Sequence, residues 1–418
     1  MARPDIDWLD IDTQQGSGTL KPVRVGICGL GTVGGGTFNV LTRNADEIAR
    51  RAGRPIVIEQ VAHRSLNPEC DLTGIKTTTD VFEVARNPDI DVVVELVGGY
   101  ELARELVLTA IANGKHVVTA NKALIAVHGN EIFQAAHEQG VIVAFEGAVA
   151  GGVPVIKSLR EGLGANRIEW VAGIINGTGN YILTHMRSEG RAFEDVLAEA
   201  QALGYAEADP TFDVEGIDAA HKLTILASIA FGVPLQFEKA YTEGISRVTF
   251  DDVEQADNLG YTIKHLGICK RTDEGLELRV HPTLIPKERL LANVHGVKNA
   301  IAIMGDAVGP TLYYGAGAGA EPPHRRWSPT CWTLPGISPP TTTTGCPTWP
   351  SSALVTTTAA CRSCPWRISS PPTTCACWRS TVPAYWHGWR PSSPSRGSPS
   401  RRWCRRRPPK GNWCRSFC

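Results

Sequence analysis

The fold class follows from one stretch, Val23-Arg24-Val25-Gly26-Ile27-Cys28-Gly29-Leu30-Gly31-Thr32-Val33-Gly34. An apolar run leads directly into the pattern G-x-G-x-x-G, and residues 33–41 after it suit a helix. In a strand–loop–helix unit the three glycines provide a tight turn, close approach of the backbone to a pyrophosphate, and close packing of helix on strand. The helix N-terminus adds amide donors and a partial positive charge. The stretch therefore predicts a dinucleotide-binding α/β domain.

The same alternation continues along the chain. Further strands are expected at residues 56–62, 91–97, 116–119 and 141–145, and helices at 101–113 and near 130–139. Strands that alternate with helices imply a parallel sheet covered on both faces. After residue 151 the pattern changes, with strands expected at 167–176 and 276–282 and helices at 193–203 and 217–231. We predict a Rossmann-type doubly wound parallel sheet followed by a second domain of the α+β class.

These patterns suggest five segments. The expected divisions are an N-terminal segment at 1–21, a dinucleotide-binding domain at 22–150, a second domain at 151–308, a glycine-rich segment at 309–322, and a compositionally different tail at 323–418.

Composition separates the tail from the rest of the chain. The 97 residues from Pro322 hold 14 of the 42 basic residues and none of the 42 acidic ones, so residues 1–321 carry a net charge of −14. An acidic body argues against a nucleic-acid enzyme. Its three scattered cysteines suit a reducing cytoplasm. No signal peptide or apolar run of membrane length is recognised, so a cytoplasmic enzyme is expected, without a membrane partner.

The end of the second expected strand bears on the choice of dinucleotide. An NAD site usually has an acidic residue there for the ribose hydroxyls. Here the strand runs into His63 and Arg64 instead. An arginine can pair bidentately with a 2′-phosphate, which favours NADP with NAD tolerated. The alternative is a solvated surface arginine.

The densest cluster of reactive groups lies between Gly204 and Lys222, where five carboxylates precede one lysine. Asp218 and Lys222 are four residues apart on the expected helix and share one face. Such a pocket suits a small zwitterion, because carboxylates can hold an ammonium group and the lysine can meet a carbonyl oxygen that gains charge. The alternative is an ion-paired helix start, which the helix dipole alone would favour. His221 points about 100° away and is interpreted as a core or surface histidine.

A second lysine lies at the edge of the predicted parallel sheet. Asn121 and Lys122 directly follow the strand that ends at Thr119. Ligands bind at the carboxyl ends of such strands, so Lys122 is a candidate site residue. A lone surface charge is the alternative.

Four blocks of sequence occur in the order found in one known family. They are Gly29-Leu30-Gly31-Thr32-Val33-Gly34, Thr119-Ala120-Asn121-Lys122, Asn176-Gly177-Thr178-Gly179-Asn180-Tyr181-Ile182-Leu183 and Gly204-Tyr205-Ala206-Glu207-Ala208-Asp209-Pro210, the last followed by Gly216-Ile217-Asp218 and Lys222. Over about residues 22–322 the chain resembles homoserine dehydrogenase. The Asn-Gly-Thr and Gly-Tyr-x-Glu-x-Asp-Pro blocks are specific to that family, whereas the glycine pattern is not.

The resemblance implies the reversible reduction of L-aspartate 4-semialdehyde to L-homoserine with NAD(P)H, a step toward threonine, methionine and isoleucine, in a homo-oligomeric enzyme. It implies that Lys222 donates the proton to the carbonyl oxygen and that Asp218 acts with it. Substrate-binding residues are then expected at Glu207, Asp213, Asp218, Tyr205 and Thr178. The open alternative is another Rossmann dehydrogenase of a small amino or hydroxy acid, or, more remotely, a non-catalytic NADP sensor.

The resemblance implies that residues 151–308 form a substrate and dimerisation domain and that the glycine-rich segment 309–322 returns to the cofactor domain. It also implies cofactor and metal positions. Cofactor contacts are expected at Gly29, Gly31, Thr32, Val33, Gly34, Arg64, Lys122, Gly204 and Gly319. A sodium ion is expected at Glu146, Val149, Gly151 and Val153, where one carboxylate and backbone carbonyls suit a hard cation. From the residues alone this segment is a glycine-rich interdomain turn.

Longer members of the family continue past the glycine-rich stretch from Gly315 to Gly319 with a helix and then a regulatory domain of the ACT type. This chain departs from that pattern after Pro322. Restoring one nucleotide before Pro323 in a back-translation lets the displaced frame encode an amphipathic helix, so we interpret residues 323–418 as frameshifted and expect them to be disordered. The alternative is a basic zinc or nucleic-acid-binding module that uses Cys361, Cys364, Cys375 and Cys377. Their spacing matches no common zinc pattern.

Overall fold

The computed structural model describes residues 20–317. The N-terminal segment before Leu20, the expected cofactor position Gly319 and the whole segment 323–418 lie outside the described residues. Within residues 20–317 no helix is both long and apolar enough to cross a membrane.

The first domain is built on a six-stranded sheet in the order β3-β2-β1-β4-β5-β6, with every neighbouring pair parallel. The strands are β1 (Val23–Cys28), β2 (Ile56–Ala62), β3 (Lys76–Thr78), β4 (Val92–Glu95), β5 (His116–Thr119) and β6 (Val143–Ala144). The central strands β1, β4 and β5 are almost fully buried. Such continuous apolar strands require cover on both faces.

Two layers of helices provide that cover. The helices of this domain are α1 (Thr32–Arg43), α2 (Ala45–Ala52), α3 (Val81–Arg86), α4 (Glu101–Ala112) and α5 (Lys122–Glu138). Phe38, Leu41 and Ile48 pack with one set of strand side chains, while Leu106 and Leu124 pack with the set on the opposite face. Because successive strand residues point to opposite faces, the doubly wound architecture that we predicted is confirmed.

The second domain has a mixed six-stranded sheet in the order β12-β11-β7-β9-β10-β8. Its strands are β7 (Ile168–Ile174), β8 (Tyr241–Thr242), β9 (Tyr261–Thr272), β10 (Gly275–Pro286), β11 (Lys298–Gly305) and β12 (Gly309–Ala316). All neighbouring pairs are antiparallel except β10 and β8. The expected α+β character of this domain is therefore confirmed.

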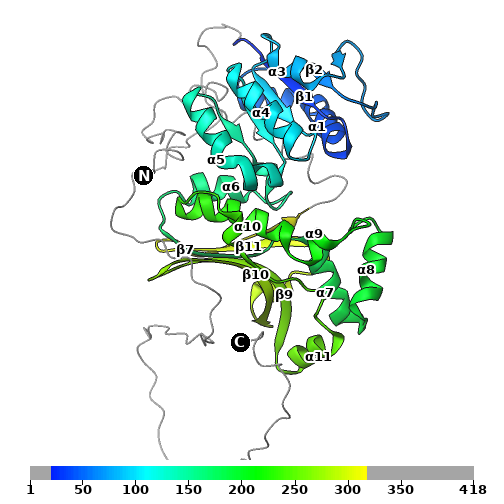
Figure 1. The fold of residues 1–418 in the computed structure, drawn as a ribbon, viewed down its shortest axis with the longest axis vertical. Helices are drawn as coiled ribbons and strands as arrows, with labels where there is room; N and C mark the ends of the chain where they lie inside the picture. The colour runs from blue at the N-terminus through cyan, green and yellow to red at the C-terminus, as the bar shows by residue number, and fades with distance from the viewer. Residues whose placement is uncertain (1–19, 318–418) are drawn as a thin grey trace, which may run out of the picture. The chain divides into compact units, whose positions relative to one another are not determined.

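Helices and short turns complete the second domain. They are η1 (Glu146–Ala148), α6 (Val155–Lys157), η2 (Ser158–Gly162), α7 (Gly177–Glu189), α8 (Phe193–Ala202), α9 (Thr211–Val214), α10 (Ile217–Phe231), η3 (Phe237–Lys239), α11 (Phe250–Asn258) and η4 (Leu290–Asn293). Helix α10 lies on the sheet against β7, β9 and β10 (Figure 1), and it also contacts α5 of the first domain. One apolar cluster runs through both domains at this contact. Residues of α5 and α10 are thereby brought together.

The structure adds elements that were not expected, among them α7, β9 and β11, and it differs from several expected bounds. β4 ends at Glu95 instead of residue 97, and α5 begins at Lys122, well before residue 130. The described part of the expected return segment 309–322 is strand β12, which pairs with β11 along its length. Its backbone groups are satisfied in the sheet of the second domain, so residues 309–316 belong structurally to that sheet.

Candidate functional site

The glycine-rich loop between β1 and α1 is closely packed on one side and open on the other. A Cβ atom at Gly34 would lie 1.9 Å from the Gly29 carbonyl oxygen, and one at Gly29, whose φ is +103°, would lie 2.5 Å from the Leu96 oxygen. A Cβ atom at Gly31 would meet no atom within 4 Å. The first and last glycines are thus required by packing, while Gly31 leaves room for a ligand. Since α1 begins at Thr32, the loop fits a pyrophosphate.

Arg64 lies two residues beyond the end of β2, in a segment that packs beside this loop. The side-chain amide of Asn67 donates to the Leu30 carbonyl oxygen at 3.1 Å and so ties the segment to the glycine loop. Arg64 itself is exposed. A cationic group at this edge of the sheet fits a phosphate on the adenosine ribose.

The most concentrated group of charges is centred on Asp218, near the start of α10. Its residue is 3% exposed. One carboxylate oxygen lies 2.7 Å from the Lys222 Nζ atom, and the other lies 3.0 Å from the Lys122 Nζ atom of α5. Lys222 also donates to the Ile175 carbonyl oxygen at 2.9 Å. The carboxylate therefore bridges two ammonium groups that come from different domains.

Asn176 completes this cluster, and our sequence analysis did not single it out as a site residue. Its amide nitrogen donates to Asp218 Oδ2 at 2.9 Å and to Asp213 Oδ1 at 2.7 Å. Its amide oxygen accepts from the Gly179 N–H at 2.7 Å, which caps α7. An asparagine at the start of a helix is a recognised N-cap, and that signal could have identified it. One side chain thus fixes the helix and orients two carboxylates.

The environment shifts the pKa values of these groups in opposite directions. Burial lowers the pKa of Lys222, although Asp218 opposes that shift, whereas the Asp218 carboxylate raises the pKa of Lys122. Burial opposes ionisation of Asp218, but the two ammonium groups lower its pKa overall. Burial and the negative charge of Asp218 raise the pKa of Asp213. The site therefore pairs a lysine that releases its proton more readily than usual with a carboxylate that stays ionised.

The other expected substrate residues lie on α7 and on the loop before α9. The Thr178 hydroxyl donates to the Tyr205 carbonyl oxygen at 2.7 Å. The Gln201 amide donates to the carbonyl oxygens of Glu207 and Ala208 at 3.0 and 3.2 Å. The Glu207 side chain is exposed, and its negative charge contributes to the raised pKa of Lys122. The structure therefore brings Asp213 into the cluster and leaves Glu207 at its rim, with Gly204 and Tyr205 also exposed.

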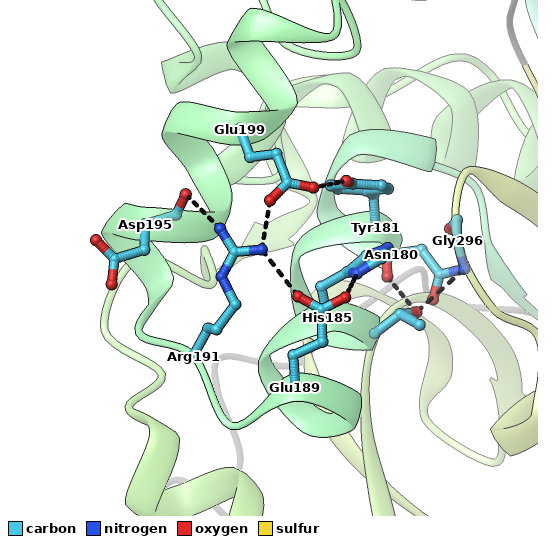
Figure 2. Close-up of polar contacts among 9 residues, drawn as sticks. Asn180, Tyr181, His185, Glu189, Arg191, Asp195, Glu199 and Gly296 are labelled. Atoms are coloured by element: carbon cyan, nitrogen blue, oxygen red, sulfur yellow. Dashed lines mark hydrogen bonds and ion pairs between the residues drawn. The ribbon is translucent and has the colours of Figure 1, made fainter.

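A polar network joins the two helices that hold this loop (Figure 2). The Tyr181 hydroxyl of α7 donates to Glu199 of α8 at 2.5 Å, and Arg191 bridges Glu199 and Glu189. The ring centroid of Tyr181 lies 5.1 Å from that of Tyr205. The network stabilises the α7–α8 unit from which the loop extends.

The expected sodium position lies in the turn formed by η1 and the start of α6. The Glu146 carboxylate accepts from the N–H groups of Ile156 and Lys157 at 3.1 and 2.9 Å. A Cβ atom at Gly151, whose φ is +41°, would lie 1.7 Å from the Gly317 oxygen. In residues 20–317 no group of three or more His, Cys, Asp or Glu side chains could hold a metal ion. A cation here would need carbonyl ligands, and the oxygen-only set of Glu146, Val149, Gly151 and Val153 fits a hard cation.

His221 is a core residue, which is one of the two alternatives, core or surface, that we predicted. It is 2% exposed, and its ring centroid lies 4.1 Å from that of Phe237 and 5.3 Å from that of Phe212. Burial lowers its pKa to about 4. It is therefore neutral near pH 7 and takes no part in the charge cluster.

Comparisons with known proteins cover both domains. The family model described as "Homoserine dehydrogenase, NAD binding domain" matches residues 29–146, and that described as "Homoserine dehydrogenase" matches residues 154–323. The chain is 76% identical over 303 residues to a homoserine dehydrogenase of Pseudomonas aeruginosa, which covers 72% of this chain and 70% of that protein. It is 58% identical over 312 residues to a homoserine dehydrogenase of Neisseria gonorrhoeae, with the same two coverages.

Solved structures agree with these sequence matches. A homoserine dehydrogenase from Thiobacillus denitrificans superposes with a TM-score of 0.73 at 65% identity, covering 75% of this chain and 73% of the other. A hyperthermophilic archaeal homoserine dehydrogenase in complex with NADPH gives a TM-score of 0.63 at 25% identity, covering 75% of this chain and 99% of the other. The chain belongs to the homoserine dehydrogenase family.

Proposed function

We propose that this chain catalyses the reversible NAD(P)H-dependent reduction of L-aspartate 4-semialdehyde to L-homoserine, a cytoplasmic step toward threonine, methionine and isoleucine, in a homo-oligomer. Membership of the family supports the reaction. The structural observation that supports it best is the Lys122–Asp218–Lys222 cluster, which both domains build beside the glycine-rich edge of the parallel sheet.

In this mechanism Lys222 is the proton donor. A nicotinamide bound here would supply the hydride to the aldehyde carbon. Lys222 Nζ would donate its proton to the carbonyl oxygen as negative charge develops there. Asp218 and the Ile175 carbonyl oxygen fix that ammonium group through hydrogen bonds of 2.7 and 2.9 Å. A donor held in one geometry does not have to reorganise as the charge appears. In the reverse direction the neutral lysine takes the proton from homoserine, and its lowered pKa favours that role.

The carboxylates around the cluster would hold the amino group of the substrate. Asp213 lies on α9 beside Asn176, and Glu207 lies on the adjacent loop. Thr178 and Tyr205 shape that loop, and Asp218 acts by holding Lys222. We assign substrate binding to Glu207, Asp213, Asp218, Tyr205 and Thr178, and proton transfer to Lys222 with Asp218.

The dinucleotide would bind across the glycine loop, with NADP preferred. The open position at Gly31 and the N-terminus of α1 suit the pyrophosphate, and the exposed Arg64 suits a 2′-phosphate. The contacts would come from Gly29, Gly31, Thr32, Val33, Gly34, Arg64, Lys122 and Gly204. A sodium ion at Glu146, Val149, Gly151 and Val153 would fix the turn between the domains.

Steady-state turnover with a substrate panel tests the function. The full chain is assayed for NADP reduction with L-homoserine, L-serine, L-threonine, L-malate and L-lactate. Homoserine should give the highest kcat/KM of the panel. The margin over malate and lactate should be at least about a hundred-fold, because a site with charged groups for the amine rejects hydroxy acids that lack it. Faster turnover of another amino or hydroxy acid would identify a different dehydrogenase, and cofactor binding without turnover would identify a sensor.

A further inference from the structure

Glu95 is a buried carboxylate at the carboxyl end of β4 that has no role in the mechanism above. The residue is 0% exposed, and within residues 20–317 it forms no ion pair with a lysine, arginine or histidine. Burial raises its pKa, and its hydrogen bonds oppose that shift. A buried carboxylate without a cationic partner is costly. Its position at the edge of the sheet where ligands bind points to a specific role.

Its oxygens connect the ends of two neighbouring strands. One oxygen accepts from the N–H groups of Val97 and Gly98 at 3.0 and 3.1 Å, in the loop after β4. The other oxygen accepts from the hydroxyl of Thr119 at 2.5 Å, and Thr119 is the last residue of β5. The two carboxylate oxygens therefore bind groups at the ends of β4 and β5, where the chain leaves the sheet.

The contacts continue from Thr119 to the start of α5. The Thr119 oxygen accepts from the Asn121 N–H at 2.9 Å. The Asn121 amide nitrogen donates to the Gly99 carbonyl oxygen at 2.6 Å, and its amide oxygen accepts from the Leu124 N–H at 3.0 Å. Asn121 is therefore both the N-cap of α5 and a second link to the loop after β4.

The residue that follows this cap is Lys122, the first residue of α5. Its backbone is held by the cap, and its side chain, 37% exposed, reaches Asp218 of the second domain at 3.0 Å. If the cap were displaced, the Lys122 backbone would shift, and its side chain would start from a different position relative to Asp218. Misplacement of a site group by about 1 Å can lower a rate about a hundred-fold.

We infer that Glu95, through Thr119 and Asn121, is a positioning residue that sets the place of Lys122 in the active site. This inference rests on the proposed function, because it assigns Lys122 to the cofactor and substrate site. A purely structural Glu95 would stabilise the fold, and its loss would have the same effect whether or not Lys122 is present.

A double-mutant cycle tests the coupling. Thr119→Val removes the hydroxyl that joins Glu95 to the cap but keeps a β-branched side chain, and Lys122→Ala removes the group that the cap positions. Thr119→Val should lower kcat/KM for homoserine and weaken NADPH binding, each by about ten-fold or more, in the wild-type background. In the Lys122→Ala background the same substitution should change both quantities less than about two-fold, because contacts that act through one residue are not additive.

Two further variants control for folding. Thr119→Ser keeps the hydroxyl and should restore activity and affinity to within about three-fold of wild type. Thr262→Val removes a buried strand hydroxyl for which residues 20–317 supply no hydrogen-bond partner, and it should leave both quantities unchanged. The melting temperature of each variant is measured, so that an unfolded variant is recognised. If Thr119→Val does not fold, kcat/KM and NADPH affinity are compared between Thr119→Ser, which keeps the hydroxyl, and Thr119→Ala, which lacks it.

The outcomes separate the inference from the proposed function. Equal losses from Thr119→Val with and without Lys122 would overturn the positioning role, as would no loss in either background. NADPH affinity, followed by fluorescence, gives this result even without turnover. Absence of homoserine turnover by the wild-type chain would instead refute the proposed function.

Discussion

Asp218 carries a negative charge at a place where only 3% of its residue is exposed, and two lysine nitrogens lie within 3.0 Å of its oxygens. Removing one partner of a buried ion pair typically costs about 3–5 kcal/mol, because an uncompensated charge remains. Here the Asn176 amide and the second lysine would still satisfy part of the carboxylate. Single lysine variants should therefore fold, which makes their kinetics interpretable.

The pH dependence of reduction should report the pKa of Lys222. Reduction requires the protonated lysine, so kcat/KM for aspartate 4-semialdehyde should fall as pH rises through a value below that of an ordinary lysine. Asp218 is the charge that raises this pKa against the effect of burial. Asp218→Asn should therefore move the alkaline limb of the profile to lower pH.

The control for this experiment is Asp209→Asn. Asp209 is exposed and accepts from the Thr211 N–H beside the site. Its substitution should leave the alkaline limb in place. A limb that stays fixed in Asp218→Asn would show that Lys222 is not the group that titrates.

Arg64 should decide between the two dinucleotides. Arg64→Ala should raise the KM for NADPH about ten- to a hundred-fold and change that for NADH little, because only NADPH has a 2′-phosphate and a charged hydrogen bond contributes about 1.5–3 kcal/mol. Steady-state kinetics with both cofactors measure the difference. Arg50→Ala, an exposed arginine of α2 that pairs with Glu47, is the matched control. Equal losses for both cofactors would indicate a structural role for Arg64.

At the scale of elements, helix α8 holds the substrate loop through Gln201, whose amide spans two carbonyl oxygens of the loop. Two neutral hydrogen bonds contribute about 1–3 kcal/mol together. Gln201→Ala should therefore raise the KM for homoserine roughly ten-fold, while kcat stays within about three-fold because Lys222 is not displaced.

The matched control is Gln134→Ala, which removes an exposed glutamine that binds Glu138 within α5. It should change neither constant. A loss of kcat in Gln201→Ala at constant KM would contradict the assignment of the loop to substrate binding.

Strand β4 shows where elements could be predicted and where they could not. The apolar run after residue 91 predicted the strand, but it did not predict the end at Glu95. The Glu95 carboxylate takes the N–H groups of Val97 and Gly98, which therefore cannot extend the parallel ladder. The end of β4 is set by hydrogen bonds from the Glu95 side chain, and the pattern of apolar residues along the chain does not show such contacts.

The site was predictable to the extent that its contacts are local. Asp218 and Lys222 form their pair within one helix, so the spacing alone indicated it. Lys122 joins them from another domain, and only the packing of α5 on α10 brings it there. Asn176 was missed because its two carboxylate partners follow much later in the chain. The early start of α5 depends on the Asn121 cap, a local signal that the apolar pattern alone did not reveal.

At the scale of the whole molecule, every described site residue lies within residues 20–317, and the composition changes at Pro322. We propose that residues 323–418 are read out of frame and replace a regulatory domain. The DNA sequence across codons 318–326 of an independent isolate tests this proposal. If independent isolates encode the same tail with no inserted or deleted nucleotide near codon 323, the frameshift is contradicted. The zinc-module alternative would then be the interpretation to test.

Removal of that segment tests its contribution to catalysis. A chain that ends at Pro322 should retain kcat and KM for homoserine within about three-fold of the full chain, because no proposed catalytic or substrate residue is removed. Parallel assays at equal active-site concentration make the comparison. A loss of turnover that persists in a folded truncated chain would show that residues 323–418 contribute to the site.

The central claim is that a homoserine dehydrogenase site is assembled around Lys222, and single-turnover oxidation of homoserine tests it most directly. NADPH formation is followed by its absorbance, with the full chain in excess and with Lys222→Ala under the same conditions. General acid–base help contributes roughly 10²–10⁴-fold, so the variant should be slower by about that factor while its NADP affinity stays near that of wild type. A Lys222→Ala protein that oxidises homoserine at the wild-type rate would contradict the account.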